Sequence, residues 1–231
     1  MINTRNVAIS VCWLLLWVWT PLIYAQDLSR YREFQLGMNL QAVAEKIDAR
    51  ASEVKALHQR PAVIQELAWR PQRALGSSRE AESVNEVLFN FYNGELFRMV
   101  VSYDQQRTEG LTDQDMVEAI SATYGIATQP VAKIVLFSSS YIYNDSEKVI
   151  ARWEDSQSSL NLFRSSSQPR FGMLIVSKRV DALADAAIVK AIRLDEQEAP
   201  QREIAREKKE GEESRAAQAK ARPANKADFR P

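Results

Sequence analysis

The chain has 231 residues, of which 45% are hydrophobic, and its 30 Lys and Arg residues balance its 30 Asp and Glu residues. That apolar content is enough for a packed core and excludes a wholly disordered protein. A net charge of zero gives no electrostatic reason to expect nucleic acid as a partner, because phosphate binding requires an excess of basic residues on some face.

The N-terminus has the pattern of a secretory signal peptide. Segment 7–19 is almost wholly apolar, Pro21 breaks it, and the small Ala25 precedes polar residues. We expect cleavage after Ala25, so that residues 1–25 are the signal peptide of an exported protein, periplasmic or extracellular. The alternative is an uncleaved anchor, because segment 7–25 approaches the ~20 residues that span a bilayer. Only the anchor would leave the chain in contact with a membrane.

One eleven-residue phrase occurs twice in the chain. Segment 37–47 reads GMNLQAVAEKI and segment 110–120 reads GLTDQDMVEAI, with Asn39 and Thr112 as candidate N-caps. The two glycines that open the phrases are expected to supply an unusual backbone angle at the helix entry. Apolar side chains then recur at helical spacing in both copies. The pattern predicts two amphipathic helices built to one plan, over residues 39–48 and 113–124.

Strand-like segments follow each predicted helix. They cover residues 63–69, 84–92 and 95–104 after the first helix, and residues 148–153, 158–164 and 171–178 after the second. Asn93-Gly94 is a strong hairpin signal between two of them. The predicted fold is α+β, with two tandem helix-plus-three-strand repeats that share one antiparallel sheet. The repeats cover about 34–104 and 107–179 within a domain of residues 26–194, because each is too short to be stable alone.

Residues 195–231 form a charged tail. The segment is rich in Glu, Lys, Arg, Ala and Gln, and Ile204 is its only large aliphatic residue, which is too little for a coiled-coil seam. The composition predicts either a frayed, solvated helix or disorder. Phe229, alone in the polar end, leaves open a short docking peptide.

Both faces of the predicted hairpin 84–103 are apolar. Simple alternation places Phe89 on the face that helices would cover and Phe97 on the opposite face. The opposite face is either buried within the chain or exposed as a binding surface. On the second interpretation, aromatic and methionine side chains with a polar margin would contact a partner. These candidate partner-binding residues are Tyr92, Phe97, Met99 and Tyr103.

The order of a Gly-Met or Gly-Leu pair, a capping residue, a short helix and strands resembles the small α/β module of the SmpA/OmlA family of outer-membrane assembly lipoproteins. Two copies in tandem resemble the β-lactamase inhibitory protein family, over residues 34–178. The resemblance implies a concave sheet and a role in protein–protein contact without catalysis. The inhibitor modules carry disulfides, whereas Cys12 is the only cysteine here and would leave with the signal. Cys12 also does not match the position of a lipidated cysteine, so neither specific role is carried over.

Candidate catalytic and metal-binding residues are few. His58 is the only histidine and its neighbours suggest a surface turn, so a zinc site or a Ser–His–Asp triad would depend on it alone. A carboxylate run could bind calcium, but it lacks the spacing of an EF-hand loop and suits turns and helix starts better. This run comprises Asp104, Glu109, Asp113 and Asp115.

The remaining acidic and serine clusters suit loops better than chemistry. Nothing places the acidic pairs across a cleft as a glycosidase requires, and none of the serine clusters lies in a Gly-x-Ser-x-Gly turn. These are Asp145 with Glu147, Glu154 with Asp155, and Ser138–Ser140, Ser158–Ser159 and Ser165–Ser167. We therefore expect no catalytic residue, cofactor or metal. The expected function is an exported, non-enzymatic protein-binding module that acts through a sheet face on another protein. A secreted hydrolase and a membrane-anchored envelope protein are the alternatives.

Overall fold

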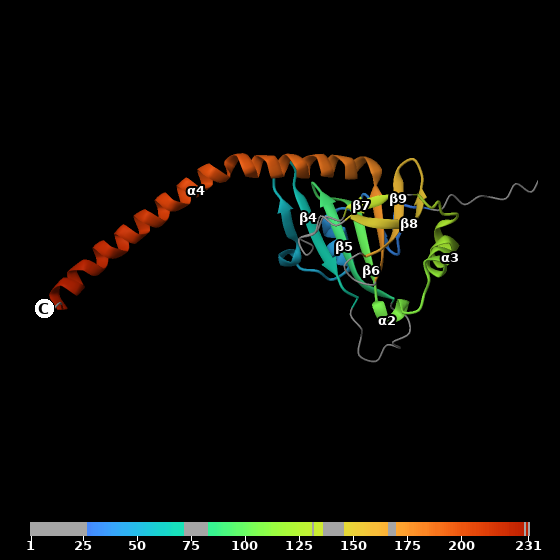
Figure 1. Ribbon diagram of the computed structural model, residues 1–231, viewed down its shortest axis with the longest axis horizontal. Coiled ribbons are helices and arrows are strands. Elements are labelled where there is room, and N and C mark those ends of the chain that lie inside the picture. The colour runs from blue at the N-terminus through green and yellow to red at the C-terminus, as the bar shows by residue number, and fades with distance from the viewer. Residues whose placement is uncertain are drawn as a thin grey trace, which may run out of the picture.

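The computed structural model describes residues 27–71, 83–130, 132–135, 146–165, 170–228 and 230 (Figure 1). The predicted signal peptide with Cys12 lies outside these residues, as do Phe229, Asp145, Ser138–Ser140 and Ser166–Ser167. The described part is an α+β fold with one eight-stranded antiparallel sheet and a long C-terminal helix. Within these ranges, no helix combines the length and the apolar character needed to cross a membrane.

The elements follow the segments that the sequence predicts, with six short additions. In chain order they are β1 (Arg30–Tyr31), β2 (Phe34–Gln35), α1 (Leu40–Lys46), the 3-10 turn η1 (Ala51–Glu53), β3 (Lys55–His58), β4 (Ile64–Trp69), β5 (Val84–Tyr92), β6 (Glu95–Tyr103), α2 (Gln105–Thr108), α3 (Asp113–Tyr124), β7 (Lys133–Val135), β8 (Ser146–Glu154), β9 (Ser158–Arg164), β10 (Phe171–Ser177) and α4 (Lys178–Asp228). The additions are β1, β2, η1, β3, α2 and β7, which have two to four residues each and are too short to develop a periodic pattern.

The two repeated phrases form helices with the expected caps. Asn39 accepts a hydrogen bond of 2.7 Å from the Ala42 backbone N–H, and Thr112 forms a capping box with Asp115. Gly37 and Gly110 precede these caps with φ values of 91° and 81°, which side chains disfavour. The capping predictions are confirmed at both helix starts.

The strand order of the sheet is β3-β4-β5-β6-β10-β9-β8-β7. Every pair is antiparallel, and all neighbours are consecutive in the chain except β6 and β10 in the centre. There, Met99 lies opposite Ile175 and Val101 lies opposite Met173. The sheet therefore consists of two four-stranded meanders that join along β6 and β10.

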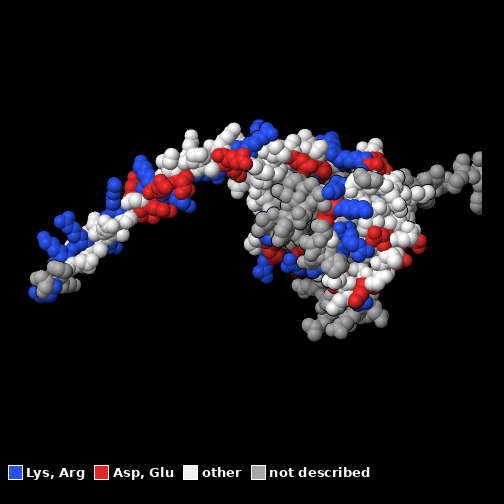
Figure 2. Space-filling view, in the orientation of Figure 1, with Lys and Arg blue, Asp and Glu red and all other residues white. Residues whose placement is uncertain are grey.

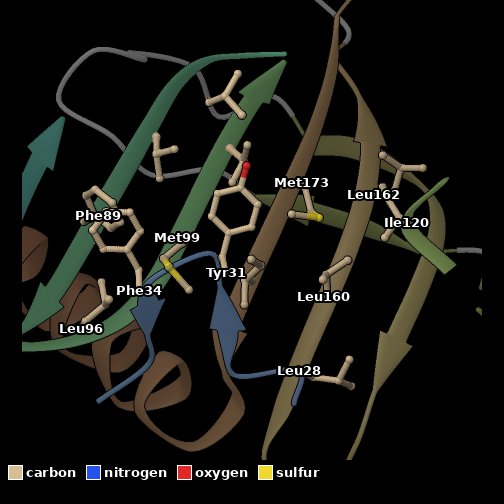
Figure 3. Packing of buried hydrophobic residues seen from close by; sticks show 14 of the residues in the cluster. Leu28, Tyr31, Phe34, Phe89, Leu96, Met99, Ile120, Leu160, Leu162 and Met173 are labelled. Carbon is tan, nitrogen blue, oxygen red and sulfur yellow. The ribbon is translucent and has the colours of Figure 1, made fainter. Parts of the chain in front are cut away.

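One face of the sheet carries the main core. The β1–β2 hairpin lies over this face, and Figure 3 shows its Tyr31 and Phe34 above the strands that carry Phe89 and Met99. The ring centroids of Phe34 and Phe89 are 4.6 Å apart. Helices α1 and α3 also contribute to this cluster, so both meanders share one core. The buried helix residues are Val43, Met116 and Ile120.

Candidate functional site

The predicted partner-binding residues do not share a face. The sequence expectation groups Tyr92, Phe97, Met99 and Tyr103. In the structure, the register shifts between Asn90 and Phe91, and Phe89 lies opposite Met99 rather than Arg98. Beyond this bulge, every β6 side chain lies on the opposite face from that given by simple alternation. The single-face prediction is therefore wrong.

The bulge divides the four residues between two buried environments. Met99 is fully buried in the main core, and Tyr103 packs against the same cluster. Burial raises the pKa of the Tyr103 phenol, whose hydroxyl lies 3.8 Å from Met173 Sδ. Phe97, only 1% exposed, packs on the other face with Tyr92 beneath α4. An exposed aromatic surface on this hairpin is not present.

Helix α4 lies across this second face of the sheet (Figure 1). Val180, Ala184 and Ile188 recur every four residues and pack against Ile64 and Phe97. A spacing of four places such side chains on one stripe of a helix. The first part of α4 is therefore an amphipathic helix of the folded domain, and it precedes the charged tail that the sequence predicts.

A buried arginine adds a polar anchor to this contact. The Arg98 side chain is 4% exposed; its Nε donates to Asp181 Oδ1 at 2.8 Å, and its terminal nitrogen donates to Asp185 Oδ1 at 3.2 Å. The two aspartates are one helical turn apart on α4, so one guanidinium can reach both. Burial raises the pKa of Asp181. The nearby charge of Asp185 raises this pKa further, while Arg98 lowers it.

Ion pairs mark both ends of the contact. At the start of α4, Lys178 Nζ donates to Glu154 Oε2 at 2.8 Å and to the Asp155 carbonyl at 2.7 Å. At the far end, the guanidinium of Arg60, from the β3–β4 connection, pairs with Glu198. The hydrogen bond from the basic partner lowers the pKa of both glutamates. Residues 178–198 of α4 are thus fixed to the sheet over a length of about 30 Å.

Beyond Glu198 the helix leaves the sheet, and we call residues 199–228 the arm. Every arm side chain that the structure describes is exposed, and Figure 1 shows the helix projecting well past the domain. At 1.5 Å per residue the arm is about 45 Å long. Helix α4 bends as it passes the edge of the sheet (Figure 1), and Pro200, which removes a backbone donor, lies inside it.

The charge of α4 changes sign along its outer part. Residues 195–213 contain eight acidic and four basic residues, whereas residues 214–227 contain four basic residues and none that is acidic. Figure 2 shows mixed red and blue atoms along residues 199–213, which we call the inner arm, and blue atoms toward the end of the helix. The inner bases face nearby acids, for example Arg206 with Glu203 at 2.6 Å and Lys209 with Glu213 at 3.8 Å. We call residues 214–227 the basic tip.

The carboxylates considered for calcium have structural roles. Asp104 accepts hydrogen bonds from the first turn of α2, and Asp115 exchanges hydrogen bonds with Thr112 at the start of α3. Asp113 pairs with Arg164 at 2.7 Å, and Glu109 is the C-cap of α2. Among the described residues, no group of three or more His, Cys, Asp or Glu side chains could hold a metal ion.

His58 and the other polar candidates also lie in regular structure. His58 ends strand β3 opposite Ile64 and is half-buried, so the predicted surface turn is wrong. Its strand was missed because the β3–β4 hairpin is short. Ser158 and Ser159 are buried in β9, and Glu147 accepts a hydrogen bond from Ser165.

A cavity of about 860 Å³ lies between the end of α1, η1 and the end of β4. Its walls carry Arg50 and Arg70 together with Asp48 and Glu53, and Trp69 supplies the aromatic surface. Arg70 is paired with Glu86 at 2.6 Å. The mixed charges select no class of ligand, and residues 72–82, which follow β4, lie outside the described chain.

No family model, curated protein or solved structure matches this chain. The resemblance to the assembly lipoproteins and the inhibitory proteins therefore stays a hypothesis. The docking of α4 was not predicted, although residues 180–191 carry its signal: apolar side chains at helical spacing with two aspartates one turn apart. No local sequence pattern indicates that these aspartates pair with Arg98, which is more than 80 residues away.

Proposed function

We propose that this chain is a non-enzymatic binding protein whose contact surface is the arm of α4. One observation carries the proposal: residues 178–198 are fixed to the sheet by buried contacts, and the arm that continues from them packs against nothing in the described chain. A helix in water gains most of its stability from packing of one face. A long helix held at one end and bare along its length is suited to receive a partner.

The sheet domain serves as the scaffold in this proposal. Its two faces bury their large apolar side chains within the chain, which argues against the sheet-face surface expected from the sequence. A secreted hydrolase has less support, because Asp104, Asp113 and Asp115 of the acidic run have structural partners. The anchor of α4 on β6 fixes the direction in which the arm leaves the domain.

We also propose that the sheet domain arose by tandem duplication. In support, Gly37 and Gly110 have matching backbone angles, and each is followed by a capped helix and then by four strands. The strand order runs outward in the same way from the central pair β6 and β10. With β3 and β7 included, each repeat would contribute a helix and four strands, which agrees with the suggested likeness to tandem inhibitory modules.

Export through the N-terminal segment is part of the same proposal. The apolar segment 7–19, Pro21 and Ala25 support it. N-terminal sequencing of the protein from a producing cell tests it: we expect the mature chain to begin at Gln26. A chain that begins at its encoded start and stays with the membrane would favour the anchored alternative.

Site-specific photo-crosslinking tests the arm as the contact surface. A photoreactive residue replaces Gln218 on the arm or, as the matched control, Gln114, which is also an exposed helical glutamine but lies on α3. We expect crosslinks to a cellular component from position 218 and none to that component from position 114. Crosslinks from position 114 alone would move the contact surface to the sheet domain and overturn the proposal.

A further inference from the structure

We infer that the basic tip of the arm, residues 214–227, binds an anionic lipid surface through the phosphates of the headgroups. This inference rests on the proposed use of the arm and names the chemistry of its partner. The sequence as a whole gives no hint of it, because the basic tip is balanced by acidic residues elsewhere.

Three cations of the tip form one stripe along the helix. Arg222 follows Arg215 by seven residues and Lys226 follows Arg222 by four. Because an α-helix turns about 100° per residue, these side chains lie within roughly 40° of one another. All three are exposed in the structure. Pro223 lies inside this part of α4, between Arg222 and Lys226. The backbone positions of the three cations span about 17 Å along the helix, which is enough to contact several headgroups together.

The cations of the tip differ from those of the inner arm in their surroundings. Arg206, Lys208 and Lys209 each face a glutamate three or four residues away, so much of their charge is neutralised within the helix. Residues 214–227 contain no carboxylate, although Glu212 lies three residues before Arg215 and Asp228 follows the tip. The tip therefore presents an excess of positive charge, which anionic headgroups complement.

The inner arm limits the contact to the tip. Residues 199–213, which separate the tip from the docked part of α4, are nearly neutral, with five acidic and four basic residues. An anionic surface that attracts the tip therefore gains little attraction from this segment. The arm thus contacts the surface by its end and holds the sheet domain away from it.

A lipid surface suits the tip better than a protein groove or a second copy of the chain. Such partners usually receive apolar side chains, and Ile204, 66% exposed, is the arm's only large aliphatic residue within the described chain. The predicted apolar segment 7–19 also favours lipid over nucleic acid. As a signal it directs the chain across a membrane during export, and as an uncleaved anchor it would hold the chain there.

Vesicle flotation of the full-length chain tests the inference. The vesicles contain phosphatidylcholine alone or with about 30% phosphatidylglycerol. The tip variant combines Arg215→Glu, Arg222→Glu and Lys226→Glu. The matched control combines Arg206→Glu, Lys208→Glu and Lys209→Glu, which makes the same change in net charge on the inner arm. Any contribution of the N-terminal apolar segment is common to all three proteins and does not depend on lipid charge.

We expect the wild type to bind anionic vesicles at least tenfold more tightly than neutral ones, and the tip variant to lose that preference. One cation near an anionic leaflet strengthens binding about fivefold, so three reversals exceed this margin. The affinity of the control variant for anionic vesicles should stay within about twofold of the wild-type value. Salt at about 0.5 M should abolish the wild type's preference for anionic over neutral vesicles.

Each other outcome overturns the inference. Equal losses of binding to anionic vesicles in the tip and control variants would mean that binding depends on the net charge of the arm and not on the tip. Duplex DNA that displaces the chain from vesicles at equal phosphate concentration would make nucleic acid the better partner. Self-association that the tip variant abolishes would identify a second copy. Crosslinks from position 218 without vesicle binding would retain the arm as the contact surface and reject lipid, so the two failures are distinguishable.

Discussion

Arg98 on β6 and Asp181 on α4 form an ion pair in which Arg98 Nε donates a hydrogen bond of 2.8 Å to Asp181 Oδ1. Arg98 also lies opposite Val176, at the line where β6 and β10 join the two halves of the sheet. One side chain therefore connects the centre of the sheet to the helix that carries the arm.

Replacement of Arg98 by Leu should lower the free energy of unfolding by about 3 kcal/mol, because it leaves the largely buried Asp181 without its cation. Urea unfolding followed by circular dichroism measures the change. Lys46→Ala is the control, since Lys46 Nζ lies 3.9 Å from Glu33 at the surface. That variant should lose about 0.5 kcal/mol or less. Equal losses would show that burial adds nothing to the Arg98 pair.

Asp181 should make the folded state more stable as the pH falls. Its pKa is raised in the folded protein by burial and by Asp185, so the folded state binds a proton more readily than the unfolded state. Its contribution is complete below the unfolded pKa and is lost as the pH rises through the folded pKa. The free energy of unfolding of the wild type and of Asp181→Asn is measured from neutral to acidic pH. On acidification, the wild type should gain stability relative to the variant. If the wild type instead loses stability relative to the variant, the pKa of Asp181 is lowered in the folded state rather than raised.

Phe97→Ala should destabilise the protein by about 3 kcal/mol, because Phe97 is buried beneath α4. Amide exchange in residues 180–191 should accelerate more than exchange in α3. Phe89→Ala, in the main core, should cost a similar amount but accelerate exchange in α1 and α3 as well. A Phe97→Ala protein with unchanged exchange in residues 180–191 would mean that α4 does not depend on this contact.

Two glycines should respond in opposite ways to substitution by alanine. A Cβ on Gly172 would lie 2.3 Å from the ring of Phe163, which is buried on the neighbouring strand, so Gly172→Ala should cost about 1–3 kcal/mol. Gly211 lies inside α4 with open space around it, and Gly211→Ala should stabilise the helix by about 0.5–1 kcal/mol. Thermal unfolding for the first variant and helix content for the second measure these changes. A neutral Gly172→Ala would show that the Phe163 ring moves freely.

Local signals in the sequence predict most of the elements. The Asn93-Gly94 turn, the strand at residues 158–164 and the caps at Asn39 and Thr112 depend on near neighbours, and the structure has each of them. The faces of Met99, Val101 and Tyr103 depend on a bulge, because one extra residue in β6 moves them to the face that carries Phe89. No local pattern marks that residue.

The candidate site was less accessible to sequence reasoning than the fold. The tail composition left helix and disorder equally open, and a zero net charge for the whole chain concealed the change of sign along α4. Arg98 and Asp181 are 83 residues apart, so their contact depends on how β6, β10 and α4 assemble. A window of charge counted along the predicted tail would have revealed the basic tip.

The position of β10 beside β6 has a consequence for the newly made chain. Residues 104–170 separate the two strands, so 67 residues must be synthesised after β6 before its partner begins to appear. At about 5–20 residues per second this takes several seconds. During that time the backbone of β6 beside Met99 and Val101 is an open apolar edge, able to pair with a strand of another nascent chain. If the chain is exported, a holding chaperone that shields residues 95–103 would protect it until β10 is made.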